Sequence, residues 1–193
     1  ASVRAEVLAG IADAASLAAW VSANRARIDA APAAWCAVEL AVIDALARDA
    51  GVSAESWLGL PETAGKFRYS AVLGDAEPAA YAATLARYRA AGFTDYKLKL
   101  SGDCARDADH LAALAGPPGA RLRLDANNLW NDPAAAAAHL AQLACVAPYF
   151  AVEEPLKVEC GAALPVLARE LDVAIVLDES LTRVAQLAAL DPG

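Results

Sequence analysis

The fold is decided by four short apolar runs that each end in charged residues: YKLKL (Tyr96–Leu100), LRLDAN (Leu122–Asn127), FAVEEP (Phe150–Pro155) and AIVLDES (Ala174–Ser180). Intervals of 26, 28 and 25 residues separate the charged positions Lys99, Asp125, Glu153 and Asp178. Such an interval fits one strand, one helix and two short loops, the repeat of a parallel β/α unit. Equivalent positions of successive units gather at one end of the sheet. The sequence therefore predicts one lysine and three carboxylates around one pocket.

The same repeat extends towards the N-terminus. The run FRYSAVLG (67–74) reads as a strand, and Leu73 lies 26 residues before Lys99. Helices are expected between the strands and after the last of them, over residues 78–91, 103–115, 133–143 and 161–171 and beyond Ser180. The predicted fold class is α/β, a partial (β/α) TIM-type barrel in which residues 67–193 form the first five units of a catalytic domain. A closed barrel takes about 250 residues, so we expect a piece of a larger protein, with a sixth strand due near residues 191–193 and an open edge after the fifth.

Residues 1–66 are predicted to be helical throughout. Asp13 is a suitable N-cap for a helix running to about Arg27. Pro32 fits the first turn of a longer helix that reaches Ala50 and ends at Gly51. A short third helix is expected from Ser53. No residue of this region carries evident chemistry.

Composition narrows the class of protein. With 58% hydrophobic residues, the 193-residue chain can bury a core without disulfides. The net charge of −8 argues against nucleic acid or an anionic membrane as partner, and we expect neither a membrane span nor a signal peptide. The two histidines, His110 and His139, read as surface or packing residues. The cysteines lack zinc spacing and read as buried or semi-buried thiols of a cytoplasmic enzyme: Cys36, Cys104, Cys145 and Cys160.

The converging residues indicate a metal-assisted reaction. Three carboxylates without histidine or cysteine suit Mg²⁺, and after it Mn²⁺. Taken singly, Asp125 reads as a turn residue and Asp178 as part of a helix start, but their equivalent positions in consecutive units favour a joint function. Lys97 and Lys99 are two residues apart on a strand and point to the same face. A lysine beside a metal suits removal of a proton alpha to a carboxylate.

The ordered set KLK, DAN, EEP and DES resembles the enolase superfamily, in its muconate-lactonising subgroup. The resemblance implies a small-molecule carboxylate substrate and metal ligands at Asp125, Glu153 and Asp178. It also implies Lys99 as the acid/base, with Lys97 as its catalytic neighbour. Residues 1–66, with AAWCAVELAVIDALARDAG (33–51), resemble the C-terminal helical part of that family's α+β capping domain. Two further residues would support the ligands without binding the metal: Asn127 and Glu179.

Within that subgroup, LRLDANNLW, VEEPL and LDESLTR are most similar to the o-succinylbenzoate synthases. These Mg²⁺-dependent lyases of menaquinone biosynthesis dehydrate a cyclohexadiene carboxylate through an enediolate. Dipeptide epimerases, or other racemases and cycloisomerases of the superfamily, are the alternative. Syn elimination of water can use one lysine as base and then acid, whereas epimerisation needs a proton carrier on each face. Two expectations from another class stay open: a non-catalytic half-barrel, and a homo-oligomer formed through the open edge.

Overall fold

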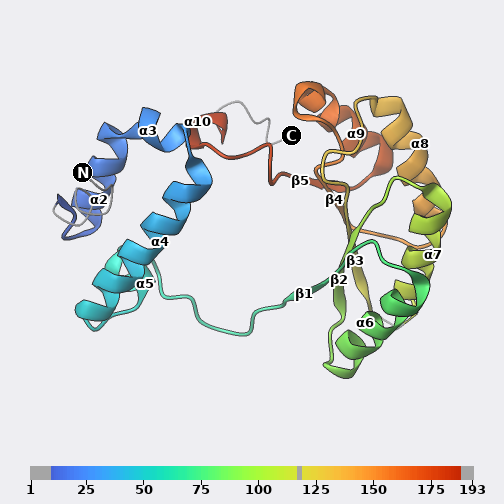
Figure 1. The fold of residues 1–193 in the computed structure, drawn as a ribbon, viewed down its shortest axis with the longest axis horizontal. Coiled ribbons are helices and arrows are strands. Elements are labelled where there is room, and N and C mark those ends of the chain that lie inside the picture. Colours follow the sequence, from blue (N-terminus) through green and yellow to red (C-terminus); the bar gives the residue numbers. More distant parts are fainter. Residues whose placement is uncertain (1–9, 117–118, 188–193) are drawn as a thin grey trace. The chain divides into compact units, whose positions relative to one another are not determined.

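The computed structural model describes residues 10–116 and 119–187 (Figure 1). The described chain forms two compact units. One contains the residues up to Lys66 with Thr182–Ala185, and the other contains Phe67–Leu181 with the residues from Gln186. Residues 191–193, where a sixth strand was expected, lie outside the described part. No helix within that part is both long and apolar enough to cross a membrane.

The first unit contains four helices in its described N-terminal residues: α2 (Ala14–Ala23), α3 (Arg25–Asp29), α4 (Pro32–Asp49) and α5 (Ala54–Trp57). Asp13 caps α2 as expected, in a capping box with Ser16. The expected single helix to Arg27 is wrong, because the chain breaks at Asn24. Asn24 is the C-cap of α2, and both its backbone N–H (3.0 Å) and its side chain (2.9 Å) donate to the Trp20 carbonyl. Residues 58–66 are not helical either.

Helix α4 begins and ends where the sequence predicts. Pro32 occupies its first turn, and Gly51 follows it with a φ of +69°, a conformation that glycine adopts without strain. The helix buries Val42 in a small core with Ile11 and Leu17. Two tryptophans on neighbouring helices, Trp20 and Trp35, stack with ring centroids 4.6 Å apart. Both rings pack against this small core.

The second unit is built on a parallel sheet in the order β1-β2-β3-β4-β5. Its strands are β1 (Ser70–Leu73), β2 (Asp95–Lys99), β3 (Arg121–Asp125), β4 (Ala151–Glu153) and β5 (Ala174–Val176). Its helical segments are α6 (Pro78–Ala90), α7 (Cys104–Leu114), α8 (Pro133–Ala144), η1 (Val158–Ala163) and α9 (Leu164–Leu171). The residues of the short helix α10 (Val184–Leu187) are divided between the two units. The predicted α/β fold with five parallel β/α units is confirmed.

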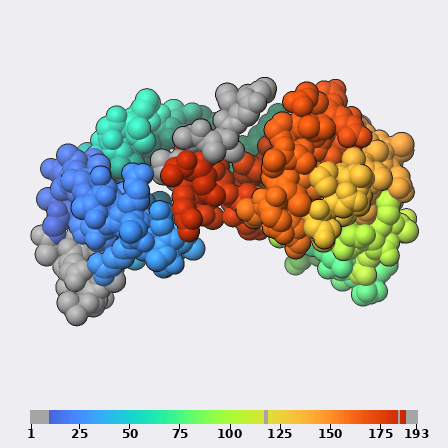
Figure 2. Space-filling model, turned by 90° about the horizontal axis from the view of Figure 1, so that it is seen from above, coloured from blue at the N-terminus to red at the C-terminus, as the bar shows by residue number. Residues whose placement is uncertain are grey.

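Helices α6 to α9 lie along one face of this sheet (Figure 1). Figure 2 shows the orange atoms of α9 packed against the yellow atoms of α8. The core between helices and sheet is mainly leucine, and its completely buried leucines are Leu111, Leu114, Leu124, Leu140 and Leu143. The helices cover only one face, so the charged residues of the strands must use the other.

The strand register aligns the charged residues. Lys99 pairs with Asp125, Asp125 with Glu153, and Glu153 with Val176. Asp178 therefore lies two residues beyond the row that the other three share. Since side chains alternate along a strand, a two-residue offset keeps the same face. The sequence interval of 25 residues did not reveal this offset.

Several expectations about single residues need correction. Cys36 and Cys145 are exposed, not buried, because they lie on the outward sides of α4 and the α8 C-terminus. By contrast, the expectation of surface or packing histidines is confirmed, because His110 and His139 are buried packing residues. The His139 Nε2 atom contacts the buried carboxylate of Asp107 at 3.0 Å, which explains how a polar ring is accommodated there.

Candidate active site

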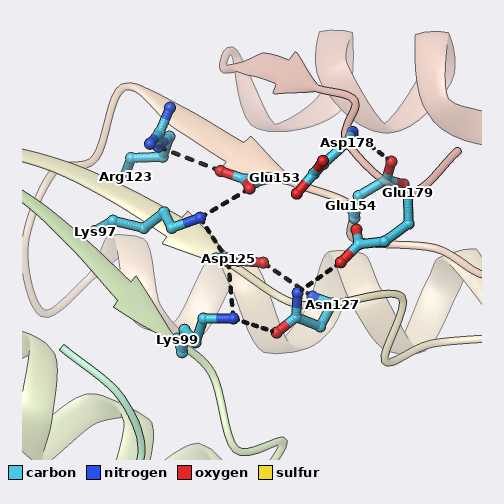
Figure 3. Close-up of polar contacts among 9 residues, drawn as sticks. All are labelled: Lys97, Lys99, Arg123, Asp125, Asn127, Glu153, Glu154, Asp178 and Glu179. Carbon is cyan, nitrogen blue, oxygen red and sulfur yellow. Dashed lines mark hydrogen bonds and ion pairs between the residues drawn. The ribbon is translucent and has the colours of Figure 1, made fainter. Parts of the chain in front are cut away.

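The C-terminal ends of β2, β3 and β4 bring four charged residues together. Figure 3 shows Lys97 and Lys99 from β2, Asp125 from β3 and Glu153 from β4 pointing towards one another. The two carboxylates are buried, with side chains 1% and 6% exposed. Buried carboxylates need compensating charge or hydrogen bonds. The sheet geometry supplies that charge from the neighbouring strand.

Lys97 bridges the two carboxylates. Its Nζ lies 2.9 Å from Asp125 Oδ2 and 2.9 Å from Glu153 Oε1. Burial acts to lower the pKa of Lys97, but the hydrogen bond to Glu153 and the charges of both carboxylates outweigh it. The pKa of Lys97 therefore lies above its ordinary value. Lys97 is a permanent cation between the two acids.

Lys99 has a different environment. Its Nζ donates to Asn127 Oδ1 at 2.9 Å and lies 3.6 Å from Asp125 Oδ2. Its side chain is 41% exposed, against 15% for Lys97. Lys99 is thus the lysine that a molecule arriving from solvent can reach, while Asn127 fixes its direction.

The carboxylates fit a hard divalent cation in their chemistry. Asp125 Oδ1 accepts from the Asn127 backbone N–H (3.1 Å). The other oxygen, Oδ2, is buried and accepts no hydrogen bond, although Lys97 is close enough for an ion pair. A buried oxygen with free acceptor capacity beside a second carboxylate is the donor set that Mg²⁺ prefers.

The three predicted ligands do not form a complete metal site in the described residues. No three histidine, cysteine, aspartate or glutamate side chains in the described ranges are grouped closely enough to hold a metal. Asp178 is exposed and follows β5, and Figure 3 shows its carboxylate directed towards Glu153. The assignment of Asp125, Glu153 and Asp178 as metal ligands therefore stays a prediction.

Asn127 and Glu179 are joined directly. Asn127 Nδ2 donates to Glu179 Oε1 at 3.1 Å, so a chain of contacts runs from Lys99 through Asn127 to Glu179 (Figure 3). Asn127 adopts a φ of +43°, in the left-handed region that asparagine tolerates better than most residues. The turn after β3 thereby presents its amide group to both partners.

Sequence reasoning missed Arg123. Its Nε lies 3.4 Å from Glu153 Oε2, and the side chain is 28% exposed. Arg123 thus neutralises the oxygen of Glu153 that Lys97 does not reach. The signal was present in RLRLD, because a residue two positions before Asp125 shares its face of the strand.

As a whole, the site places two buried carboxylates and a partly exposed amino group at one end of the sheet. Three positive side chains, Lys97, Lys99 and Arg123, contact two buried carboxylates. Such a site attracts an anionic molecule at its open side, next to Lys99. Proton transfer at a carbon beside a carboxylate is chemistry that this arrangement can support.

The sequence was compared with protein families and with curated proteins. A family described as enolase C-terminal domain-like matches residues 80–190, more than half of the chain. No curated protein matches the chain.

Solved structures with a similar fold are numerous. A mandelate racemase/muconate lactonizing enzyme from Bordetella bronchiseptica RB50 matches with a TM-score of 0.74 and 24% identity, over 93% of this chain and 50% of its own. A dipeptide epimerase from Cytophaga hutchinsonii, complexed with Mg and the dipeptide D-Ala-L-Val, gives a TM-score of 0.62 and 25% identity over 72% and 37%. A dipeptide epimerase from Enterococcus faecalis V583 gives 0.51 and 28% over 56% and 32%. This chain spans half or less of each of these three proteins.

Proposed function

Because this chain belongs to the enolase C-terminal domain-like family, we propose that it is part of a Mg²⁺-dependent enzyme. The enzyme removes a proton from the carbon next to a substrate carboxylate. In this proposal, residues 67–193 belong to the catalytic barrel domain and residues 1–66 to its capping domain. The substrate is a small carboxylate, and the enzyme acts in the cytoplasm.

One observation carries this proposal: Lys99 is a partly exposed amino group 3.6 Å from Asp125, at the end of the sheet where Lys97 joins Asp125 to Glu153. A candidate base and two buried carboxylates are thus adjacent. Adjacency matters because proton removal beside a carboxylate needs a base and a positive charge at once.

Asp125, Glu153 and Asp178 are the residues that would hold the metal. The buried Asp125 Oδ2, which accepts no hydrogen bond, supports this role for Asp125. The Cytophaga hutchinsonii dipeptide epimerase that resembles this chain was crystallised with Mg. Mg²⁺, when bound, supplies positive charge that stabilises the negative charge building up on a substrate carboxylate.

The other side chains have distinct roles in the proposal. Lys99 accepts the proton and later returns it, and Asn127 holds its amino group at 2.9 Å. Lys97 stays protonated and holds the Asp125 and Glu153 carboxylates together as a fixed positive charge. Arg123 keeps Glu153 in place from the opposite side (3.4 Å). Glu179 steadies Asn127 through their hydrogen bond.

We further propose that the reaction is the dehydration performed by o-succinylbenzoate synthases. The stretches LRLDANNLW, VEEPL and LDESLTR support this assignment. The reaction also needs only one lysine on one face of the substrate, and Lys99 can be that lysine. Syn elimination places the departing proton and the departing hydroxyl on the same face, so a single lysine can act as base and then as acid.

A specific observation favours a second candidate, epimerisation of dipeptides. Two of the similar solved structures, 28% and 25% identical to this chain, are dipeptide epimerases. Epimerisation requires a second proton carrier opposite Lys99. Both lysines that contact Asp125 come from β2, and so they approach the site from the same strand.

The test measures product formation and deuterium incorporation at the reacting carbon in heavy water. Both candidates predict Mg²⁺-dependent activity that a chelator abolishes. Loss of water from the cyclohexadiene carboxylate would establish the synthase. Deuterium incorporation into dipeptides without any action on that compound would establish the epimerase. A protein that exchanges no such proton with either substrate contradicts the proposed function.

A further inference from the structure

Glu154 is an unusual residue in the turn after β4. It is a carboxylate only 1% exposed, and its backbone has a φ of +42°. The left-handed conformation costs glutamate more free energy than it costs asparagine or glycine. A buried charge on a strained backbone persists only where surrounding contacts fix it. The contacts of Glu154 therefore indicate its role.

Two oxygens of Glu154 accept four hydrogen bonds. Oε1 accepts from the backbone N–H groups of Asp178 (2.6 Å) and Ser180 (2.7 Å). Oε2 accepts from Ser180 Oγ (2.5 Å) and Asn128 Nδ2 (2.9 Å). These donors come from the turn after β3 and the turn after β5. One carboxylate thus ties together the ends of three neighbouring strands.

The backbone of Glu154 strengthens the same connection. Its N–H donates to the Val176 carbonyl at 3.0 Å, and its carbonyl accepts from the Asn128 N–H at 2.7 Å. Glu154 is therefore bonded through main chain and side chain to both adjacent turns. A leucine of similar size would fill the space but could accept none of the four hydrogen bonds.

We infer that Glu154 is a positioning residue, which fixes the Asp178–Ser180 turn and so sets where the Asp178 carboxylate lies relative to Glu153 and Asp125. This inference rests on the proposed function, in which Asp178 is the third metal ligand. Figure 3 shows Glu154 beside the Asp178 backbone, with the Asp178 side chain directed towards Glu153. Glu154 itself acts through the backbone of its neighbour and not on the substrate.

The experiment compares Mg²⁺ affinity and amide hydrogen exchange among variants of the whole chain. Glu154→Ala should weaken Mg²⁺ binding in calorimetry at least ten-fold and speed hydrogen exchange at Asp178 and Ser180. Glu154→Gln should fall between it and the wild type, because its amide oxygen still accepts two N–H groups while its NH₂ faces the Asn128 amide as a second donor.

A matched control separates positioning from general stability. Tyr149→Phe removes a buried hydrogen bond to the Leu140 carbonyl (2.9 Å) in the same unit, away from these turns. It should lower the unfolding midpoint and leave Mg²⁺ affinity unchanged. If Glu154 contributed only to stability, Glu154→Ala and Tyr149→Phe would lower Mg²⁺ affinity equally, or neither would lower it.

The outcomes distinguish the two proposals. If the wild type binds Mg²⁺ and folded Glu154→Ala binds it equally well, the positioning role is overturned and the proposed function stands. If the wild type binds no Mg²⁺, the proposed function fails, and hydrogen exchange still decides whether Glu154 fixes the turn. Should Glu154→Ala not fold, Ser180→Ala replaces it, because this change removes only one of the four donors and must weaken binding in the same direction.

Discussion

The ammonium of Lys97 and the buried carboxylate of Asp125 lie 2.9 Å apart, yet no hydrogen bond reaches the Asp125 Oδ2 atom. The same ammonium does donate a hydrogen bond to Glu153, at 2.9 Å. The two acids therefore share one cation, and one of them retains acceptor capacity. The first prediction tests this shared cation, and the second tests Lys99 beside it.

Replacing Lys97 with methionine should destabilise the fold. The change keeps most of the side-chain volume but leaves two buried carboxylates without their common cation. Removing one partner of a buried ion pair costs about 3–5 kcal/mol. Urea unfolding measures this loss, and Mg²⁺ should restore part of it by replacing the missing charge. The exposed Lys157→Met is the control. Equal stability of the two variants would contradict the bridging role.

Replacing Lys99 with alanine should affect the reaction more than the fold. Lys99 is the proposed proton carrier, so kcat should fall by at least the ~10²–10⁴ typical of general acid–base catalysis. Substrate and metal binding should largely remain, because Asp125 and Glu153 keep Lys97. Asp125→Ala should instead weaken Mg²⁺ binding, with partial recovery in excess Mg²⁺. Full activity of Lys99→Ala would refute the assigned roles.

Asp107 supports a different part of the site, the turn that follows Lys99. Its buried carboxylate accepts from the Ser101 N–H (2.8 Å), Ser101 Oγ (2.7 Å) and the Gly102 N–H (3.1 Å), and contacts His139. Asp107→Ala removes the acceptor of these donors, which belong to the half-buried Ser101 and the exposed Gly102. The free energy of unfolding should fall by about 1–3 kcal/mol in all.

Chemical denaturation of Asp107→Ala and of the neighbouring surface variant Asp109→Ala gives the comparison. Asp109 is exposed on the same helix, so its removal should change the free energy of unfolding little. If both variants unfold at the same urea concentration, the Asp107 contacts do not contribute as the structure indicates.

The fourth prediction concerns alkaline pH. Burial raises the pKa of Tyr149 to about 12, from an ordinary value of 10.0. The folded state thus keeps its proton at a pH where the unfolded state has lost it. The stabilising contribution is complete below about pH 10 and disappears as the pH rises to about 12.

The free energy of unfolding should therefore fall between these pH values, and it should fall less steeply in Tyr149→Phe. Urea unfolding at a series of pH values measures the slope, and phenolate absorbance follows the titration directly. Tyr81, whose pKa burial also raises, contributes to the slope that remains. Identical slopes in the two proteins would show that Tyr149 titrates normally.

The sequence predicted the sheet well because its signals are local. Apolar runs at a regular interval identified the strands of the repeat, and Pro32 with Gly51 marked both ends of α4. The break at Asn24 was missed, because the sequence does not show that this asparagine side chain bonds back to the Trp20 carbonyl. Local patterns report periodicity, but they do not report which polar side chain competes for a carbonyl.

The site was predicted less completely, since its contacts join residues far apart in the chain. The row of Lys99, Asp125 and Glu153 followed from the interval. Glu154 did not, because its donors at Asn128, Asp178 and Ser180 lie 24 to 26 residues away. Nothing in EEP distinguishes a glutamate that faces a pocket from one that binds the two neighbouring turns.

The register of Lys99, Asp125 and Glu153 also determines which insertions and deletions the chain can tolerate. One residue added within β2, β3 or β4 would turn the following side chain to the helix-covered face and empty its place in the row. Residues added to the connecting helices or outer loops would leave the row intact, because closing a longer loop costs little. Related chains that keep this chemistry should therefore differ in length between the strands and agree in length within them.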